Sequence, residues 1–101
     1  MKLSELEIQK IKKFFIGKPV IKAYLFGSFA REQADNESDL DVLVELDYSK
    51  HIGLGFVTMQ QELEQTMKRK VDLVSTNAVS KYFLPFIDKD KKLIYERKNR
   101  R

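Results

Sequence analysis

Residues 25–44 read LFGSFAREQADNESDLDVLV, and the interpretation of the whole chain starts from this stretch. Two apolar segments flank a polar loop. Gly27 and Ser28 end the first segment, and Asp39 and Asp41 begin the second. Because alternate residues of a strand point to the same side, we expect the two aspartates to share one face of a strand. The pattern indicates a site for metal ions and for the phosphates of a nucleotide.

The paired aspartates predict a metal site because of their charge. Two carboxylates about 6–7 Å apart along a strand repel each other by about 2–3 kcal/mol at an effective dielectric constant near 20. Mg²⁺ would offset this repulsion, since it binds one or two carboxylates and completes its shell with water and phosphate oxygens. Asp72, in the short apolar segment Val71–Val74, is a candidate third ligand from a neighbouring strand. Three such carboxylates can hold two metal ions about 4 Å apart, which serve phosphoryl or nucleotidyl transfer.

The Gly27-Ser28 pair would provide the phosphate-binding half of the site. Glycine permits a tight turn from strand to helix and lets a phosphate approach the backbone. The N–H groups at the start of a short helix, together with the Ser28 hydroxyl, could then bind phosphate oxygens, and Arg31 could add a charge-assisted contact. Each piece has a simpler explanation, a helix cap for Gly-Ser and a solvated loop edge for Asp-x-Asp. Their order and spacing make the combination more specific than its parts.

Hydrophobic spacing and turn residues divide the remaining chain into alternating helices and strands. Ser4 and Glu7 form a capping box that predicts the start of the first helix, and Gly17 with Pro19 predicts its end. The expected helices cover residues 4–15, 28–33, 54–70 and 77–90 (interrupted at Pro85), and the expected strands 20–26, 40–46, 71–74 and 93–95. This order predicts an α/β or α+β fold in which helices flank a small sheet of three to four strands. Periodicity does not settle whether the sheet is parallel or mixed.

Composition bounds the class of protein. The chain has 101 residues, of which 43% are hydrophobic and 34% charged, as expected for one globular domain. It contains no cysteine and no apolar run long enough to cross a membrane, and its first residues do not resemble a signal peptide. We therefore expect a cytoplasmic location and no membrane partner. The single histidine, His51, has no second histidine with which to share a metal, so a surface position is expected.

The net charge of +4 is concentrated near the C-terminus. Residues 1–87 carry equal numbers of basic and acidic side chains, whereas residues 88–101 hold seven Lys/Arg and three Asp/Glu. We expect a domain over residues 1–96 and a basic tail over residues 97–101. The tail could contact nucleic acid or an acidic partner, or simply be a solvated terminus. The overall charge is thus weak support for nucleic-acid binding, and nucleic acid is not expected as the direct substrate.

At this point the motif can be compared with a known family. Gly27-Ser28, ten intervening residues, Asp39-Leu40-Asp41 and the later Val71-Asp72-Leu73 resemble the signature of the DNA polymerase beta-type nucleotidyltransferase superfamily. The short chain and the sequence Gly-Ser-Phe-Ala-Arg resemble its minimal nucleotidyltransferases, the MNT-domain proteins. The resemblance implies a mixed sheet, Asp39 and Asp41 as ligands of divalent metal, Ser28 on the nucleotide phosphates, and Asp72 as a third carboxylate that aids deprotonation of the acceptor hydroxyl.

The same resemblance implies a partner and a reaction. MNT proteins are typically antitoxins paired with a helical HEPN-type ribonuclease toxin, and members of the group transfer AMP from ATP to a tyrosine of that toxin. The expected function is therefore Mg²⁺-dependent transfer of a nucleoside monophosphate to a hydroxyl group of another molecule. Two alternatives remain: a non-catalytic module that neutralises its partner by occlusion, and a small-molecule nucleotidyltransferase. The latter is disfavoured because such enzymes usually carry a second, substrate-binding domain.

One residue departs from the motif of the family. Relatives often continue Ala-Arg with Gly, whereas this chain has Glu32 at that position. If the position requires a left-handed backbone, a residue other than glycine costs about 1–2 kcal/mol. Glu32 also places a negative charge near the expected phosphate site. The departure bears on the affinity for the nucleotide and leaves the expected fold unchanged.

Overall fold

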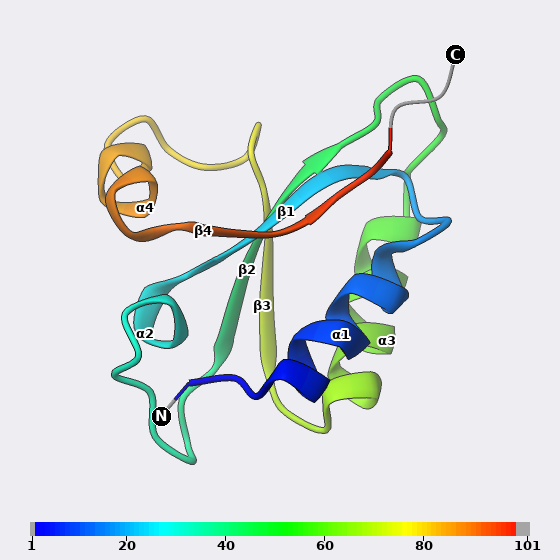
Figure 1. Ribbon diagram of the computed structural model, residues 1–101. Coiled ribbons are helices and arrows are strands. Elements are labelled where there is room, and N and C mark those ends of the chain that lie inside the picture. The colour runs from blue at the N-terminus through cyan, green and yellow to red at the C-terminus, as the bar shows by residue number, and fades with distance from the viewer. Residues whose placement is uncertain (1, 99–101) are drawn as a thin grey trace.

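The computed structural model describes residues 2–98, which form four helices and four strands (Figure 1). In chain order the elements are α1 (Glu5–Phe15), β1 (Val20–Phe26), α2 (Gly27–Ala30), β2 (Leu40–Leu46), α3 (Gly55–Met67), β3 (Val71–Ser75), α4 (Leu84–Asp90) and β4 (Lys92–Glu96).

The four strands form one mixed sheet in the order β3-β2-β1-β4. β1 pairs antiparallel with both β2 and β4, and β2 pairs parallel with β3. Because of these directions, the end of β1 and the starts of β2, β3 and β4 lie at the same edge of the sheet. The mixed sheet that the resemblance implied is confirmed, and the topology brings the two halves of the predicted motif to one edge.

The first helix begins as its sequence predicts. The Ser4 side chain accepts a hydrogen bond from the Glu7 backbone N–H (3.1 Å), and the Glu7 carboxylate accepts one from the Ser4 N–H (2.9 Å). This reciprocal pair satisfies two donors at the helix start that would otherwise lack partners. Ile11 and Phe15 then point one face of α1 into the core, where both are fully buried.

One face of the sheet forms the hydrophobic core with α1 and α3. Leu40, Val42 and Val44 alternate along β2 and are fully buried, as are Ile11 of α1 and Leu63 of α3. Figure 1 shows α1 and α3 next to each other on one side of the strands, with α2 and α4 on the other. The opposite face of β2 carries Asp41, so one strand serves the core with one set of side chains and the candidate site with the other.

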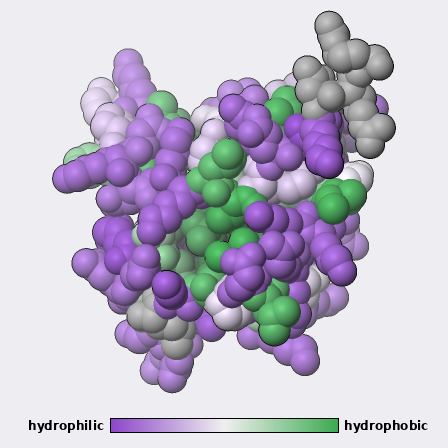
Figure 2. Space-filling view, viewed as in Figure 1, coloured by the Kyte–Doolittle hydropathy of each residue, from purple (hydrophilic) through white to green (hydrophobic). Residues whose placement is uncertain are grey.

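Apolar side chains are not confined to the core. Figure 2 shows hydrophobic residues gathered in the middle of the viewed face, surrounded by hydrophilic ones. Among the exposed large hydrophobic residues, Tyr82, Phe83 and Phe86 belong to the segment that leads into and forms α4. α4 has no fully buried side chain: Leu84 and Ile87 are half-buried, and Asp90 at its end pairs with Arg31.

Three predicted helices are shorter in the structure by two or more residues, and the other predicted elements begin and end within one residue of the observed ones. The helix expected over residues 28–33 is the single turn Gly27–Ala30. The helix expected over residues 54–70 ends at Met67, because Lys68 adopts a left-handed backbone (φ 53°) that terminates α3. Residues 77–83 form turns and not a helix, so α4 begins only at Leu84, with proline in its first turn. The predicted strands 20–26 and 40–46 are confirmed residue for residue.

The C-terminal segment is attached to the sheet as far as Arg97. Its backbone N–H donates to the Ile21 carbonyl oxygen (2.8 Å), and its guanidinium pairs with the Asp47 carboxylate at 2.9 Å. The rest of the predicted basic tail, Asn99–Arg101, lies outside the described residues. Within residues 2–98, no helix has the length and apolar character needed to span a membrane.

Candidate active site

Two aspartates face each other at the edge where β1 ends. Asp41 of β2 and Asp72 of β3 are partners in the parallel register. Directly paired residues of neighbouring strands lie about 4.8 Å apart and point to the same side of the sheet. Asp41 is half-buried and Asp72 is exposed. The sequence pattern placed Asp72 on a neighbouring strand, and the register puts it directly beside Asp41.

Asp39 completes the acidic group from the loop immediately before β2. It is exposed, and it is two residues from Asp41 along the chain. Burial raises the pKa of Asp41 to about 6, the negative charges of Asp72 and Asp39 add to the rise, and Arg31 opposes it. Asp72 and Asp39 are therefore close enough to Asp41 to disfavour its negative charge.

Gly27 sits against this acidic group for a steric reason. Its φ of +71° is in the left-handed region that L side chains rarely adopt. A Cβ atom built there would collide with Oδ2 of Asp41 and would lie 3.1 Å from its Cγ. Glycine at this position thus permits both the turn from β1 into α2 and the close approach of the Asp41 carboxylate.

The turn that follows presents Ser28 at the same edge. Ser28 is half-buried, whereas Phe29 and Ala30 are buried and anchor α2 in the core. The Ser28 carbonyl accepts a hydrogen bond from the Gln33 N–H at 2.8 Å, which closes the loop after α2. No side-chain cap occupies the start of α2. Its first N–H groups thus have no capping side chain competing with a phosphate oxygen.

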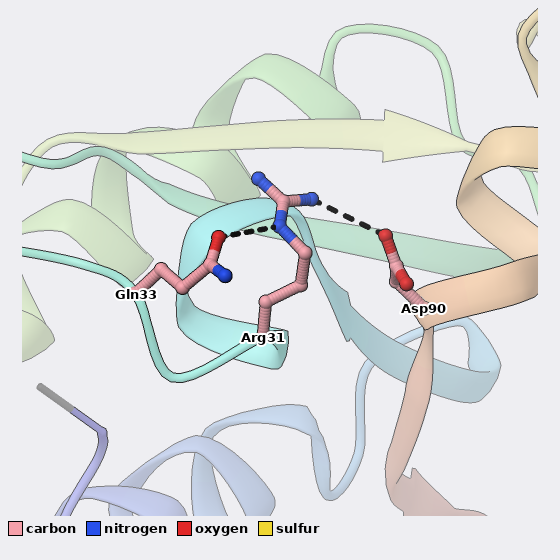
Figure 3. A network of polar contacts seen from close by, with 3 residues as sticks. All are labelled: Arg31, Gln33 and Asp90. Carbon is pink, nitrogen blue, oxygen red and sulfur yellow. Dashed lines mark hydrogen bonds and ion pairs between the residues drawn. The ribbon is translucent and has the colours of Figure 1, made fainter.

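Arg31 lies near the acidic group, but its contacts are with other residues. Its Nη1 pairs with Asp90 Oδ2 at 3.3 Å, and its Nε donates to Gln33 Oε1 at 3.1 Å (Figure 3). The ion pair joins the end of α2 to the end of α4. Figure 3 shows the guanidinium extended between its two partners. The predicted contact of Arg31 with phosphate would therefore require it to exchange or share its bond with Asp90.

Glu32, which stands where relatives often have glycine, adopts a left-handed backbone. Its φ is 59°, a conformation that glycine adopts without the steric cost of a Cβ atom. The Glu32 carboxylate lies 3.5 Å from Lys92 Nζ, at the start of β4. The chain therefore tolerates a strained residue here and uses its side chain in a second link between α2 and the C-terminal elements.

Arg69 contacts α2, and no pattern in the sequence predicts this contact. Its guanidinium carbon lies 4.8 Å from the centre of the Phe29 ring, in cation–π range. The Arg69 Nε is buried without a hydrogen-bond partner among the described residues. Arg69 sits in a run of three basic residues, Lys68–Lys70, and nothing in that run distinguishes the one that packs on Phe29.

The acidic group can be compared with the needs of a metal ion. Within residues 2–98, no group of three or more His, Asp or Glu side chains is arranged so that it could hold a metal ion, so the three predicted ligands Asp39, Asp41 and Asp72 do not form a three-carboxylate site in this structure. The donor type nevertheless fits Mg²⁺, which prefers carboxylate oxygens and needs only one or two of them from the protein. The facing pair Asp41 and Asp72 meets that need. Asp39, in the adjoining loop, is a further carboxylate within electrostatic reach.

Comparison with known proteins identifies the relatives of this arrangement. Residues 9–100 match the model of the family described as "Polymerase beta, Nucleotidyltransferase". A protein of Methanocaldococcus jannaschii named as protein adenylyltransferase MJ1379 is 34% identical over 98 residues, which cover 92% of this chain and 96% of the relative.

Two solved structures show the same fold. A chain in the crystal structure of a toxin–antitoxin with AMP-PNP superposes with a TM-score of 0.76 at 22% identity, over 89% of this chain and 73% of that one. A chain in the complex of tri-AMPylated Shewanella oneidensis HEPN toxin with MNT antitoxin has a TM-score of 0.72 at 21% identity, over 94% and 74% of the two chains.

Proposed function

This chain belongs to the polymerase beta nucleotidyltransferase family, and from that membership we propose that it transfers AMP from ATP to a hydroxyl group of a protein partner. The observation that carries the proposal is the register of the parallel strands, which sets Asp72 directly beside Asp41. The left-handed Gly27 supports it, because the absence of a Cβ atom lets the Asp41 carboxylate lie against the turn from β1 into α2, where the phosphate-binding N–H groups are proposed.

Each residue has a role in the proposed reaction. Asp41 and Asp72 would hold Mg²⁺, which would supply positive charge for the triphosphate and the reacting oxygens, and Asp39 is proposed to join them when the metal–nucleotide complex binds. Gly27 and Ser28 would bind phosphate oxygens through backbone N–H groups and the hydroxyl, and Arg31 would add a positive charge. The acceptor oxygen bonds to the α-phosphorus, the bond from that phosphorus to the pyrophosphate oxygen breaks, and pyrophosphate leaves. Asp72 would receive the proton of the acceptor hydroxyl.

The position of Asp72 suits an acceptor on another molecule. Asp72 is exposed and lies on β3, an edge strand of the sheet. Three exposed aromatic side chains, Tyr82, Phe83 and Phe86, lie in and just before α4, which is joined to α2 by the ion pair of Arg31 with Asp90. Exposed aromatic residues are typical of protein contact surfaces. A HEPN-type helical toxin that presents a tyrosine is the acceptor we propose, with this chain as its antitoxin.

Transfer of labelled AMP to the protein encoded by the neighbouring gene tests the proposal. Wild-type protein incubated with α-labelled ATP, Mg²⁺ and that partner is expected to label it, and mass spectrometry is expected to place the AMP on a tyrosine. Asp41→Asn is expected to abolish labelling, and chelation of Mg²⁺ with EDTA to do the same. Full labelling by a folded Asp41→Asn variant would refute the assignment.

The exposed aromatic residues also favour a second candidate function, neutralisation by occlusion. In that case the chain covers its partner without modifying it, and Phe83 and Phe86 would supply the contact. Growth rescue separates the two: an Asp41→Asn variant that still protects cells from the toxin supports occlusion, whereas a variant that binds without protecting supports transfer. Phe86→Ser complements Asp41→Asn, because it is expected to weaken binding of the partner while leaving the acidic group intact.

A further inference from the structure

A basic groove lies at the end of the sheet away from the acidic group. It has a volume of about 1010 Å³ and is formed by the end of α1, the loop after β2 and the segment after β4. Six basic side chains line it: Lys12, Lys13, Lys18, Lys50, Arg97 and Lys98. Its apolar wall includes Ile16 and the ring of Tyr95, which packs on Phe15 with ring centres 5.7 Å apart.

Most of the positive charge in this groove is not neutralised by the protein. Glu96 is the acidic residue of the lining, and its carboxylate lies 3.9 Å from Lys22. Arg97 pairs with Asp47. Among residues 2–98, Lys13, Lys50 and Lys98 form no ion pair. Like charges gathered without acidic partners repel one another, so the arrangement favours an anionic occupant.

The groove is separate from the candidate active site. The acidic group lies where Phe26 pairs with Asp41, whereas the groove lies where Val20 pairs with Leu46, at the other end of the same two strands. The seven residues of β1 span about 20 Å at 3.3 Å per residue. A ligand in the groove therefore does not compete for the nucleotide site, and this surface is additional to the proposed transfer reaction.

We propose that the groove binds the sugar–phosphate backbone of a single-stranded polynucleotide. Such sites combine a positively charged groove that follows the phosphates with aromatic side chains on which bases stack. Here the lysines supply the charge, and Tyr95 supplies the aromatic surface.

The lining suits a polynucleotide better than an acidic protein because it combines positive charge with an aromatic ring. Five of the six cations are lysines, which bind phosphate oxygens as point charges. Tyr95 adds a ring on which a base can stack, a contact that an acidic peptide does not need. The one arginine in the described lining, Arg97, is already engaged by Asp47 at 2.9 Å.

Fluorescence anisotropy with labelled oligo(U) and oligo(dT) of about 12 nucleotides tests the proposal. We expect both to bind the full chain with Kd in the range of about 10⁻⁶–10⁻⁴ M, and log Kobs to fall linearly with log salt concentration. The variant Lys13→Gln/Lys50→Gln/Lys98→Gln is expected to weaken binding roughly tenfold at low salt. It should also reduce the salt slope by about 2, since each lost phosphate contact contributes about 0.7 on a single strand.

A matched variant removes the same charge elsewhere. Lys10→Gln/Lys68→Gln/Lys81→Gln changes three exposed lysines that do not line the groove, and it is expected to weaken binding less than about twofold. Equal losses in the two variants would show that net charge alone is responsible and would overturn the proposal. Displacement of the oligonucleotide by a polyglutamate peptide of equal charge at equal concentration would overturn it in favour of an acidic protein ligand.

Discussion

At the scale of single residues, the candidate site depends on a carboxylate whose ionised form lowers the stability of the metal-free protein. Asp41 is half-buried beside Asp72 and Asp39, and its pKa is raised to about 6. A residue that lowers stability when ionised is usually retained for a function that needs its charge. The same carboxylate excludes any side chain at Gly27, so two residues of the motif are coupled sterically as well as chemically.

Asp41→Asn is expected to stabilise the metal-free protein at neutral pH. The folded-state pKa of about 6 exceeds the ordinary value of 3.8, so ionisation of Asp41 costs stability as pH rises between these values. Because the group is partly solvated, the gain at pH 7 is expected to be about 1–2 kcal/mol and not the full shift. Thermal unfolding in EDTA at pH 4 and pH 7 measures it, with little difference expected at the lower pH.

Glu37→Gln provides the control, because it removes one negative charge from an exposed position in the same loop region as Asp39. Its effect on the unfolding free energy is expected to stay within about 0.5 kcal/mol at both pH values. A stabilisation by Asp41→Asn that is equally large at pH 4 would mean that ionisation of the half-buried Asp41 is not its cause.

Alanine substitutions at three different glycines distinguish backbone strain at Gly27 from collision of a new Cβ atom with Asp41. Gly27→Ala is expected to lower the free energy of unfolding by about 2 kcal/mol or more, because it combines a left-handed backbone with the collision against Asp41. Gly17→Ala has a φ of +85° but open space around its Cβ, so a loss of about 1 kcal/mol from the backbone is expected. Gly55→Ala, within helix α3 and in open space, should be neutral or stabilising. Urea unfolding ranks the three, and equal losses at residues 17 and 27 would exclude the collision.

At the scale of elements, ion pairs connect α4 and β4 to earlier parts of the chain, in addition to the pairing of β4 with β1. The ion pairs of Arg31 with Asp90 and of Lys92 with Glu32 join α2 to α4 and to the start of β4. At the other end of β4, Arg97 joins the loop after β2 through Asp47. The pair of Arg31 with Asp90 connects α4 to the end of α2, beside the candidate site.

The Asp47 link predicts a pH dependence opposite to that of Asp41. Hydrogen bonds from Ser49, with further help from Arg97, lower the pKa of Asp47 to about 2. The contribution of this carboxylate is therefore complete above its ordinary pKa near 4 and is lost as pH falls toward 2. Asp47→Asn is expected to lower the melting temperature at pH 7, with the difference from wild type shrinking between pH 4 and pH 2.

The longer ion pair between Glu96 and Lys22, at the same end of the sheet, provides a control for the Asp47→Asn substitution. Glu96 lies 3.9 Å from Lys22, and both side chains are exposed, so Glu96→Gln is expected to change the melting temperature little. A loss for Glu96→Gln as large as that for Asp47→Asn would show that any acidic residue near the end of β4 has the same effect.

At the scale of the whole molecule, charge is divided between two ends of one sheet. The acidic group lies where β1 ends, and the basic groove lies where β1 begins. The two proposed sites, for a metal–nucleotide complex and for a polyanion, therefore lie at opposite ends of the sheet, and we expect that a ligand at one does not disturb the other.

Mg²⁺ with ATP is expected to raise the melting temperature of the wild-type protein. A ligand that binds only the folded state adds about 2.7 kcal/mol at a concentration 100 times its Kd. The rise should disappear in Asp41→Asn, and it should persist in the groove variant Lys13→Gln/Lys50→Gln/Lys98→Gln. Loss of the rise in the groove variant would contradict the independence of the two ends. Differential scanning fluorimetry across a titration of MgATP measures both.

Much of the fold and the acidic group was predictable from sequence because the signals are local or strictly periodic. The capping box at Ser4 needs only four residues to define a helix start, and strands 20–26 and 40–46 show clear apolar content between turn residues. The two-residue period of a strand predicted that Asp39 and Asp41 share one strand face, but only Asp41 lies in β2, because the strand begins at Leu40 and Asp39 belongs to the loop before it. The mixed sheet came from the family resemblance, since periodicity alone left strand directions open.

Only the tertiary structure decided which distant residues meet. Strand order and direction placed Asp72 beside Asp41, and they also gathered α1, the loop after β2 and the segment after β4 into one basic groove. The packing of Arg69 on Phe29 and the pairing of Arg31 with Asp90 likewise join residues far apart in the chain. The physical reason is that local sequence determines backbone conformation over a few residues, whereas contacts between segments depend on how the whole apolar core packs.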